Sequence, residues 1–377
     1  MAGCSIVFYD TGLNSKIPDL QRVSAAVFPF WGDYTFLDCS LADYLQAEDA
    51  RRILVLEGPH RAAHGSALSR WKKAALEVVL LSNGIESFIE TLEGIESKVV
   101  ILSALSYVAS FDGAELCRLA ARRGRRLDKI AAGGVPLELY SADRGHLVEL
   151  LRAAVSRYLG HGSFGAALFE RILHTSFDEL VEIPGDFFLQ NDLMELYGAN
   201  MALLGLRRNA AARLLYDRLA RFAPERPTSV VGEKAYVKNS HLGSGVDIQG
   251  HVENSVIFSR VGVKAKTKII DSVIMNDNQI GGRSTIAGAM LFPYSREAMK
   301  GSSNIEDAVS IGSASSTARN RDFPDQIRDG LTVIGMNAEI PRGAVIEPGC
   351  YVGGGVSAHD IKRLKTLKRG SSVYQGD

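Results

Sequence analysis

A six-residue unit repeats without interruption in Ile334-Gly-Met-Asn-Ala-Glu, Ile340-Pro-Arg-Gly-Ala-Val, Ile346-Glu-Pro-Gly-Cys-Tyr and then Val352-Gly. Each unit opens with an aliphatic residue, and a small residue follows four positions later. An amphipathic helix repeats its apolar residues about every 3.6 positions, so a period of six excludes one. The period is typical of a β-helix, in which each unit forms one short strand and one corner.

The same pattern extends outward toward residue 230. In such a coil the aliphatic side chain fills a narrow core, and glycine supplies the backbone freedom that the corner needs. The 37 glycines, about 10% of the 377 residues against an average near 7%, agree with this. An ordinary β-sandwich would instead show a period of two. The earlier units are Val231-Gly-Glu-Lys-Ala-Tyr, Leu242-Gly-Ser-Gly-Val-Asp, Ile248-Gln-Gly-His-Val-Glu, Val261-Gly-Val-Lys-Ala-Lys and Ile280-Gly-Gly-Arg-Ser-Thr.

The first half of the chain has a different pattern. Helical segments such as Gly113–Arg123 separate short apolar runs, which favours βαβ units around a parallel sheet. We therefore predict an α/β domain over residues 1–205, a helical linker over 206–228 and a β-helix over 229–377. A Ser-rich segment at about 293–330 breaks the repeat and is interpreted as an insertion. The apolar runs are Ser5–Tyr9, Arg52–Leu56, Val78–Leu81 and Val99–Leu102.

Charge and cysteine content exclude several classes of protein. The 43 basic residues balance the 43 acidic residues, so no overall field favours nucleic acid or an anionic membrane. Cys4, Cys39, Cys117 and Cys350 form no CxxC or Cys/His cluster, which predicts reduced thiols and neither a zinc site nor a disulfide framework. The first residues lack a basic targeting region, and no apolar run spans a membrane. We expect a cytoplasmic protein.

Segments in both halves resemble one family, the bacterial glucose-1-phosphate adenylyltransferases (ADP-glucose pyrophosphorylases), and look closest to its GlgD-type non-catalytic subunit. The resemblance implies a degenerate, shortened nucleotidyltransferase-like domain of the Rossmann-like GT-A type, followed by a left-handed parallel β-helix. The segments that carry it are Arg22–Asp38, Asn191–Leu204, Pro227–Ser240, Ile248–Phe258, Asp271–Met275 and Leu331–Ile346.

The resemblance implies that the residues needed for adenylyl transfer from ATP to a sugar phosphate are replaced in this chain. Family members carry GGxGxRL after the first strand, where Ile6–Ser15 holds the single Gly12 and no arginine. The family's two metal-binding carboxylates would fall at Ser103–Ser106 and Phe187–Leu189, and its lysine falls on or near Ser24. Little sequence separates Gly58 from Trp71, or Leu127 from Leu137, where substrate-binding segments are expected.

We therefore assign no catalytic, cofactor-binding or metal-binding residue, although the family uses Mg²⁺ and ATP. Asp112 and Asp186 are the carboxylates nearest to the two metal positions. Asp112 is better interpreted as the N-cap of the helix that follows it.

Two basic clusters remain as candidates for an anionic effector such as a sugar phosphate or nucleotide. The first consists of Arg122, Arg123, Arg125 and Arg126, which a position at a helix C-terminus also explains. The second is the segment Lys362–Arg369.

Three functional hypotheses stay open. The first is a silent subunit or paralogue that forms a homo-oligomer or hetero-oligomer, with an active adenylyltransferase as partner, in glycogen synthesis. The second is an active glucose-1-phosphate adenylyltransferase. The third is a hexapeptide-repeat acyltransferase, which would use a histidine in the coils, His241 or His251. His359 lies outside the repeats and is interpreted as solvated.

Overall fold

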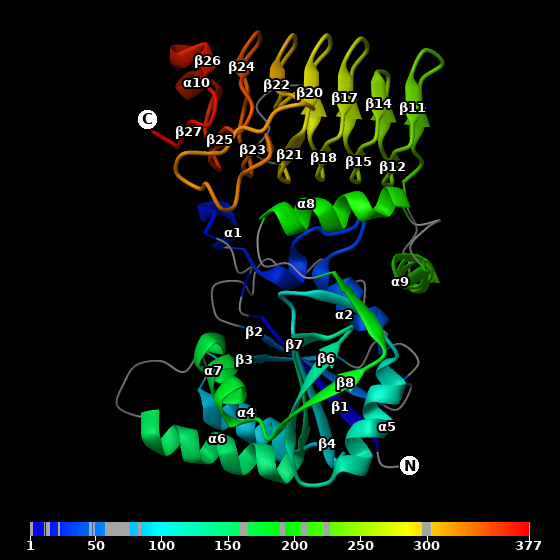
Figure 1. Cartoon of the computed structure of the whole chain (residues 1–377), viewed down its shortest axis with the longest axis vertical. Coiled ribbons are helices and arrows are strands. Elements are labelled where there is room, and N and C mark those ends of the chain that lie inside the picture. Colours follow the sequence, from blue (N-terminus) through cyan, green and yellow to red (C-terminus); the bar gives the residue numbers. More distant parts are fainter. Residues whose placement is uncertain are drawn as a thin grey trace.

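The computed structural model describes residues 3–10, 12, 16–21, 23–44, 47, 50–56, 76–81, 84–158, 165–188, 193–205, 210–221, 227–295 and 303–376. Figure 1 shows two parts: an α/β half built by the first part of the chain, and a stack of short strands built by the second. None of the described helices is long and apolar enough to cross a membrane.

A seven-stranded sheet forms the centre of the α/β half, in the order β3-β2-β1-β4-β7-β6-β8. The four runs predicted as strands are strands, within two residues at each end. The two central ones, β1 and β4, are completely buried, as their continuous apolar sequence requires. The strands are β1 (Cys4–Tyr9), β2 (Arg51–Leu56), β3 (Leu76–Leu80), β4 (Val99–Ala104), β6 (Leu127–Ala132), β7 (Val135–Asp143) and β8 (Glu179–Ile183).

The prediction of a parallel sheet is wrong for one strand. β7 runs antiparallel to both β4 and β6, so the sheet is mixed. The reason is local, because β6 and β7 are joined by Gly133 and Gly134, with φ of +58° and +77°. Two residues in this conformation make a tight hairpin turn, which connects antiparallel strands only.

Helices cover the sheet and link it to the second half. α5 confirms the predicted helix and its cap: the Asp112 carboxylate accepts hydrogen bonds from the amides of Ala114 at 3.0 Å and Glu115 at 3.1 Å. The helices are α1 (Pro18–Gln21), α2 (Phe36–Ala42), α4 (Ile85–Glu93), α5 (Gly113–Arg123), α6 (Arg144–Tyr158), α7 (Ala166–Ser176), α8 (Leu193–Met201) and α9 (Ala210–Arg221), with the 3-10 turns η1 (Ala25–Val27) and η4 (Ala202–Gly205) and a two-stranded ladder of β5 (Val108–Phe111) and β9 (Gly185–Phe188).

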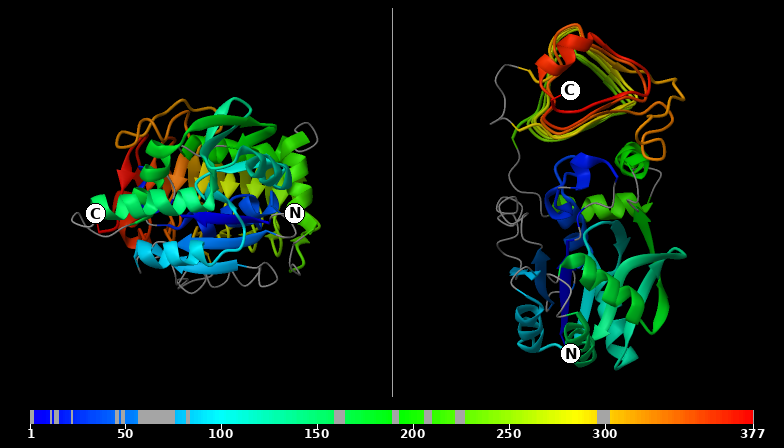
Figure 2. Two further views of the ribbon diagram at one scale, coloured as in Figure 1. Left: turned by 90° about the horizontal axis from the view of Figure 1, so that it is seen from below. Right: turned by 90° about the vertical axis from the view of Figure 1, so that its left-hand side faces the viewer.

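The second half is a β-helix, as the six-residue repeat predicts. Three parallel sheets form the sides of a triangle, which is visible end-on in the right-hand view of Figure 2. The first sheet contains β10 (Val230–Val231), β13 (Asp247–Ile248), β16 (Gly262–Val263) and β19 (Gln279–Ile280). The second contains β11 (Tyr236–Lys238), β14 (His251–Glu253), β17 (Lys268–Ile270), β20 (Thr285–Ala287), β22 (Ser310–Gly312), β24 (Val345–Ile346) and β26 (Thr366–Leu367). The third contains β12 (His241–Leu242), β15 (Val256–Ile257), β18 (Val273–Ile274), β21 (Ala289–Leu291), β23 (Thr332–Ile334), β25 (Tyr351–Val352) and β27 (Ser372–Val373), and α10 (Ala358–Leu364) lies at the last coil.

The register of the early coils differs from the strict repeat. Val263, rather than Val261, pairs with Ile248 and Ile280. The small residue four positions on is therefore the buried Thr267. Corners of unequal length shift the phase of the six-residue repeat from coil to coil. The regular run from Ile334 onward gives no sign of this shift.

The expected insertion at about 293–330 contains residues of the β-helix itself. Ile305 forms bridges to Ile280 and Ile340, and β22 pairs with β20 and β24. Residues 305–312 thus belong to the β-helix. The polar composition of this stretch hid the two aliphatic residues, Ile305 and Ile311, that fill the core.

One corner of the β-helix explains why glycine alone does not mark the coils. Asn239, Asn254 and Asp271 occupy it in three successive coils with φ between +44° and +46°, and Gly288 occupies it in the fourth with φ of +57°. Asn and Asp tolerate this left-handed conformation better than other side chains. The side-chain Nδ2 of Asn239 also donates to Oδ1 of Asn254 at 2.8 Å, which ties two coils together.

The two halves pack against each other through α1, α8 and the segment before α2. Figure 1 shows α8 lying along the β-helix, and the Tyr197 hydroxyl donates to the Asp271 carbonyl at 2.6 Å. The Asp33 carboxylate accepts from the Ser244 amide at 3.0 Å, and the Tyr351 hydroxyl donates to Asp19 at 2.9 Å. The β-helix is therefore a direct neighbour of the residues that follow β1.

Candidate functional site

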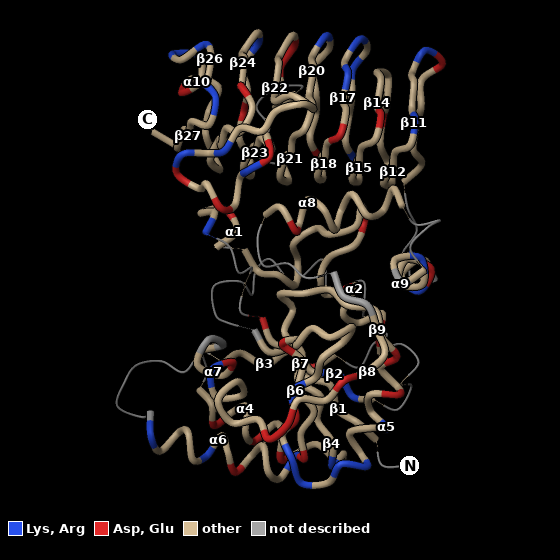
Figure 3. Tube along the Cα trace, viewed as in Figure 1, with Lys and Arg blue, Asp and Glu red and all other residues tan. Residues whose placement is uncertain are grey.

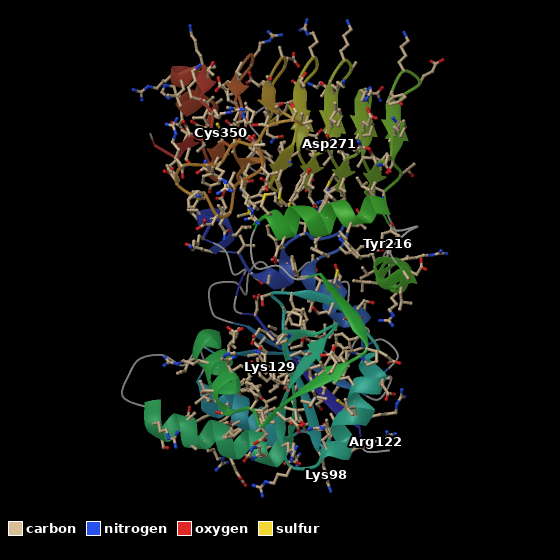
Figure 4. The ribbon with its side chains drawn as sticks, in the orientation of Figure 1. Lys98, Arg122, Lys129, Tyr216, Asp271 and Cys350 are labelled. Atoms are coloured by element: carbon tan, nitrogen blue, oxygen red, sulfur yellow. The ribbon has the colours of Figure 1, made fainter. Side chains whose placement is uncertain are left out.

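The carboxyl ends of β1 and β4 lie side by side, because Tyr9 pairs with Ala104. Lys98, which precedes β4, lies at the end of the α/β half away from the β-helix (Figure 4), so these strand ends point toward the β-helix. Ligands of open α/β sheets bind outside the carboxyl ends of the strands. The residues that follow β1 and β4, with the side chains next to them, are the candidate site.

The first residue after β1 is Asp10, a buried carboxylate that main-chain amides surround. Its Oδ1 accepts hydrogen bonds from the amides of Gly12 at 2.9 Å and Ala25 at 3.2 Å, and its Oδ2 accepts from Ala26 at 3.4 Å. Ser24, on or near which the sequence resemblance places a lysine, donates its hydroxyl to the same carboxylate. The Asp10 carboxylate thus takes the Gly12 amide of this loop and two amides of η1. Residues 11 and 13–15 of the expected nucleotide loop lie outside the described residues.

The end of β4 carries neutral groups. The Ser103 hydroxyl lies 3.0 Å from the Tyr107 hydroxyl, and both side chains are buried. Asp112, the carboxylate nearest to the first expected metal position, caps α5. The side chains of Asp186 and Leu189, at the second expected metal position, lie outside the described part of the chain. Within the described ranges, no group of three or more His, Cys, Asp or Glu side chains is placed to hold a metal ion.

Beside these strand ends lies a buried lysine that sequence reasoning missed. Lys129, labelled in Figure 4, forms an ion pair with Glu138 at 2.7 Å, and its Nζ lies 3.1 Å from Nδ1 of His174. The Tyr140 hydroxyl donates to the other Glu138 oxygen at 2.8 Å, and Nζ of Lys129 lies 5.4 Å from the centre of the Tyr140 ring. Glu138 thereby neutralises the cation. The pairing joins β6, β7 and α7, so no local pattern in the sequence could indicate it.

Glu170 on α7 completes the cluster. Burial and the negative charge of Glu138 raise the pKa of Glu170 to about 7, against a smaller opposing effect of Lys129. Burial, with Glu138 and Glu170 nearby, also raises the pKa of Tyr140. The cluster is an acid and base network in which Glu170 changes its charge near neutral pH.

Glu170→Gln is expected to flatten the pH dependence of stability. Because the folded state raises the pKa of Glu170, the favourable contribution of its proton is complete below about pH 4.5 and is lost as pH rises through 7. The amide variant should be more stable than the parent by about 1 kcal/mol at pH 8, with a smaller or reversed difference at pH 5, since partial exposure weakens the effect. Urea unfolding at both pH values measures this. Glu149→Gln, at an exposed ion pair, is the control and should show no such trend.

The arginines predicted as effector contacts lie elsewhere. Figure 4 places Arg122 at the end of the α/β half away from Lys129, and Figure 3 shows acidic segments beside this basic stretch. Arg123 pairs with Asp128 at 2.6 Å and Glu179 at 2.5 Å, Arg126 pairs with Glu179 at 2.7 Å, and Arg125 pairs with Glu149. The structure therefore does not bring these four arginines to the candidate site. Lys362–Arg369 lies at the last coil of the β-helix.

The histidines of the coils occupy different environments. His241 packs edge-on against Tyr216 of α9, with ring centres 5.7 Å apart, and lies close to Gly32. His251 lies on the outer face, 4.5 Å from the Tyr236 ring and 3.3 Å from the Glu253 carboxylate. His241 thus belongs to the contact between the halves.

A cavity of about 310 Å³ lies at this contact, and sequence analysis did not foresee it. Residues from both halves line it, among them Val27, Asp33, Tyr34, Arg260 and Asn276. The Asp33 carboxylate accepts a hydrogen bond from the Ser244 amide, and Arg260 forms a bidentate ion pair with Asp277 at 2.6 and 2.7 Å. Only the packing of two distant segments creates the cavity, so no sequence signal marks it.

Comparison with known proteins gives partial matches. A family model of the GlmU-like, C-terminal hexapeptide matches residues 226–334. The chain is 29% identical over 158 residues to the glucose-1-phosphate adenylyltransferase of Acetivibrio thermocellus. This match covers 41% of this chain and 34% of that protein. It is 34% identical over 154 residues to the glucose-1-phosphate adenylyltransferase of Pseudothermotoga lettingae, and this match covers 40% of this chain and 34% of that protein. It is 33% identical over 123 residues to the glucose-1-phosphate adenylyltransferase of Bacillus cytotoxicus, and this match covers 31% of this chain and 32% of that protein. The matches span about a third of the length of these curated relatives, and they support the family named by the sequence resemblance.

Proposed function

We propose that this chain is a catalytically silent, GlgD-like regulatory or structural subunit, or a paralogue, of glucose-1-phosphate adenylyltransferase. It assembles with a catalytic adenylyltransferase, responds to a sugar phosphate or nucleotide, and serves ADP-glucose and glycogen synthesis in the cytoplasm. Its domains divide near residues 205 and 229, and its β-helix is left-handed. The similarity to adenylyltransferases supports the family, and the geometry of the candidate site supports the silent role.

The observation that carries the proposal is the position of Asp10. Adenylyl transfer needs the loop after the first strand to hold a triphosphate with main-chain amides and cations. Here the Asp10 carboxylate accepts from the Gly12 amide of that loop and from the Ala25 and Ala26 amides of η1, at 2.9 to 3.4 Å. A carboxylate in this position occupies donors that a phosphate would otherwise use.

The neighbouring groups support the same conclusion. The hydroxyls of Ser103 and Tyr107 at the end of β4 are poor ligands for Mg²⁺, which prefers carboxylates and phosphate oxygens. Lys129, a cation near these strand ends, is already paired with Glu138.

Association with a partner is supported by the first coil of the β-helix. β10, β11 and β12 stand at one end of their sheets, with described neighbours on one side only. Val230, Val231 and Tyr236 are exposed there by 52%, 51% and 48%. Apolar side chains on unpaired strand edges favour contact with another chain.

The test measures this protein alone and with a catalytic adenylyltransferase subunit. Alone, with ATP, glucose 1-phosphate and Mg²⁺, it should release pyrophosphate no faster than a blank, since phosphate-holding groups and metal ligands each account for several kcal/mol of the barrier. Co-expressed, it should co-purify with the catalytic subunit and change that subunit's response to effectors. Pyrophosphate release by the protein alone would instead make it an active enzyme, and failure to associate would contradict the subunit role.

A further inference from the structure

A group of exposed cations lies at one edge of the β-helix, on the side that faces away from the α/β half (Figures 1 and 3). The proposed function does not use it. Within the described ranges, none of these side chains forms an ion pair. We call the group the corner patch, and it consists of Lys234, Lys266, Lys268 and Arg283.

The register of the β-helix brings three of these cations together. Lys266 and Arg283 occupy the same corner position in successive coils, with φ of +66° and +59°. The Arg283 amide donates to the Ala265 carbonyl at 3.3 Å, and the Lys268 amide donates to the Ser284 carbonyl at 2.9 Å. Because neighbouring strands lie ~4.8 Å apart, these main-chain bonds hold the three cations within reach of one anionic group.

The corner before β14 is shorter than the corners on either side of it. Two residues, Gln249 and Gly250, join β13 to β14, whereas four residues join β10 to β11 and four join β16 to β17. The turn above β14 accordingly ends short of its two neighbours (Figure 1). The corners that carry Lys234 and Lys266 therefore project on either side of Gly250, which leaves room for a ligand between them.

An aromatic pair lies next to this short corner. Tyr236 of β11 pairs with His251 of β14, and their ring centres are 4.5 Å apart. Lys268 pairs with His251 in the following strand, and the inward residues between these positions alternate with them, so the three side chains form one row on the outer face. Tyr236 is 48% exposed. Bases of nucleotides stack on exposed aromatic rings, so the row can hold a base beside a cation.

Two acidic side chains next to the corner patch are already paired with other cations. Glu253, in the strand before Lys268, forms an ion pair with Lys238 at 2.8 Å. Asp307, in the coil after Arg283, forms one with Arg342 at 3.3 Å. These carboxylates therefore leave the cations of the corner patch available to an anion from outside.

The positive charge is confined to a short stretch of this edge. Glu233 lies beside Lys234 in the first coil, and Glu306 and Asp307 follow Arg283 in the next coil. Figure 3 shows basic tips above β17 and β20 and an acidic one above β22. Three coil spacings of ~4.8 Å separate Lys234 from Arg283, which is about 14 Å. This length favours a ligand with a few phosphates over a nucleic-acid strand, whose charges would continue past the acidic residues.

We propose that the corner patch binds a nucleoside polyphosphate, with the base stacked on Tyr236 and the phosphates held by the four cations. The inference deepens the proposed function and rests on it, because it gives a nucleotide effector a place on this chain. Every base has a flat face that can stack, so the site recognises a base joined to a phosphate chain without selecting one base. Salt screens exposed charges, so binding should weaken as the salt concentration rises.

The test is calorimetry on the full-length protein, with no catalytic subunit present. The ligands are ATP, adenosine and inorganic triphosphate, and we expect ATP to bind about tenfold more tightly than either of the others. The double variant Lys266→Met with Arg283→Met should raise the Kd of ATP about tenfold or more. Lys98→Met is the matched control, since Lys98 is an exposed lysine at the far end of the α/β half, and it should leave the Kd unchanged.

Tyr236→Ala separates the base from the phosphates. It should raise the Kd of ATP about tenfold and leave that of inorganic triphosphate unchanged, while Tyr236→Phe retains ATP binding. An unchanged Kd of ATP in the double variant would overturn the site, and so would an equal loss of both ligands in Tyr236→Ala for the role of the base. Tighter binding of a single-stranded oligonucleotide than of ATP would overturn the nucleotide in favour of a nucleic acid.

The two proposals fail separately. Because these measurements use the chain alone, loss of the corner patch as a binding site would leave its association with a catalytic subunit intact. Failure to associate would contradict the proposed function while the Kd values of ATP stand.

Discussion

Arg218→Met is expected to lower the free energy of unfolding by about 3–5 kcal/mol at pH 8, because it leaves a buried carboxylate without its cation. Nη1 of Arg218 lies 2.9 Å from Oδ1 of Asp43 and also donates to the Phe111 carbonyl at 2.8 Å. The Asp43 side chain is 2% exposed and the Arg218 side chain 14% exposed. One guanidinium thus connects α9, the end of α2 and β5.

The loss should decrease as the pH falls. Burial already raises the pKa of Asp43 well above its usual range, and Arg218 acts in the opposite direction. Without Arg218 the pKa rises further, so the variant takes up a proton at a higher pH and the uncompensated charge disappears. Denaturant unfolding at pH 8 and pH 5 measures the difference.

Arg213→Met on the same helix is the matched control. Its ion pair with Asp217 is 3.8 Å long and exposed, so its loss should change stability by less than about 0.5 kcal/mol. A loss for Arg218→Met as small as this, or one that grows toward acidic pH, would contradict the interpretation of Asp43 as a buried anion.

Gly113→Ala should cost about 3 kcal/mol, although alanine is the better helix former. A Cβ at Gly113 would lie 2.4 Å from the Asp43 carbonyl oxygen and 2.6 Å from the Tyr44 ring. The Asp43 carbonyl is main chain and accepts from the Gly113 amide at 3.0 Å, so it cannot move away without losing that bond. Overpacking of this kind costs about 1–3 kcal/mol or more.

Gly198→Ala provides the comparison, since Gly198 is also in a helix, α8, and apart from the backbone of that helix its Cβ would meet no heavy atom within 4 Å. This variant should gain about 0.5–1 kcal/mol from the lower entropy of its unfolded chain. Thermal unfolding of the two variants should shift in opposite directions. Equal shifts would show that the close approach of α5 to Asp43 does not limit this position.

Agreement between sequence and structure is best where neighbouring residues decide the outcome. Asp112 caps α5 because a carboxylate and the next two amides are adjacent in the chain. The β-helix core follows from single aliphatic residues such as Ile334 and Ile346, each 1% exposed. The register around Val263 was wrong, because the length of a corner depends on the coils it joins.

The candidate site could be located only in outline. Its place after β1 and β4 was foreseen, whereas the replacement of adenylyltransferase residues near Gly12 and Ser24 stays a prediction. The partners of Asp10 and the ion pair of Lys129 with Glu138 could not be read from the sequence. Each depends on strands and loops that meet only when the sheet forms.

The sequence by itself determined the β-helix, the α/β half and the cap of α5, because a repeat period and a capping residue act within a few positions. The tertiary structure alone decided that β7 runs antiparallel to β4 and that Arg218 pairs with the buried Asp43. These contacts join residues that are 36 to 175 positions apart. Whether a buried charge has a partner depends on the packing of whole elements, and no local pattern encodes that packing.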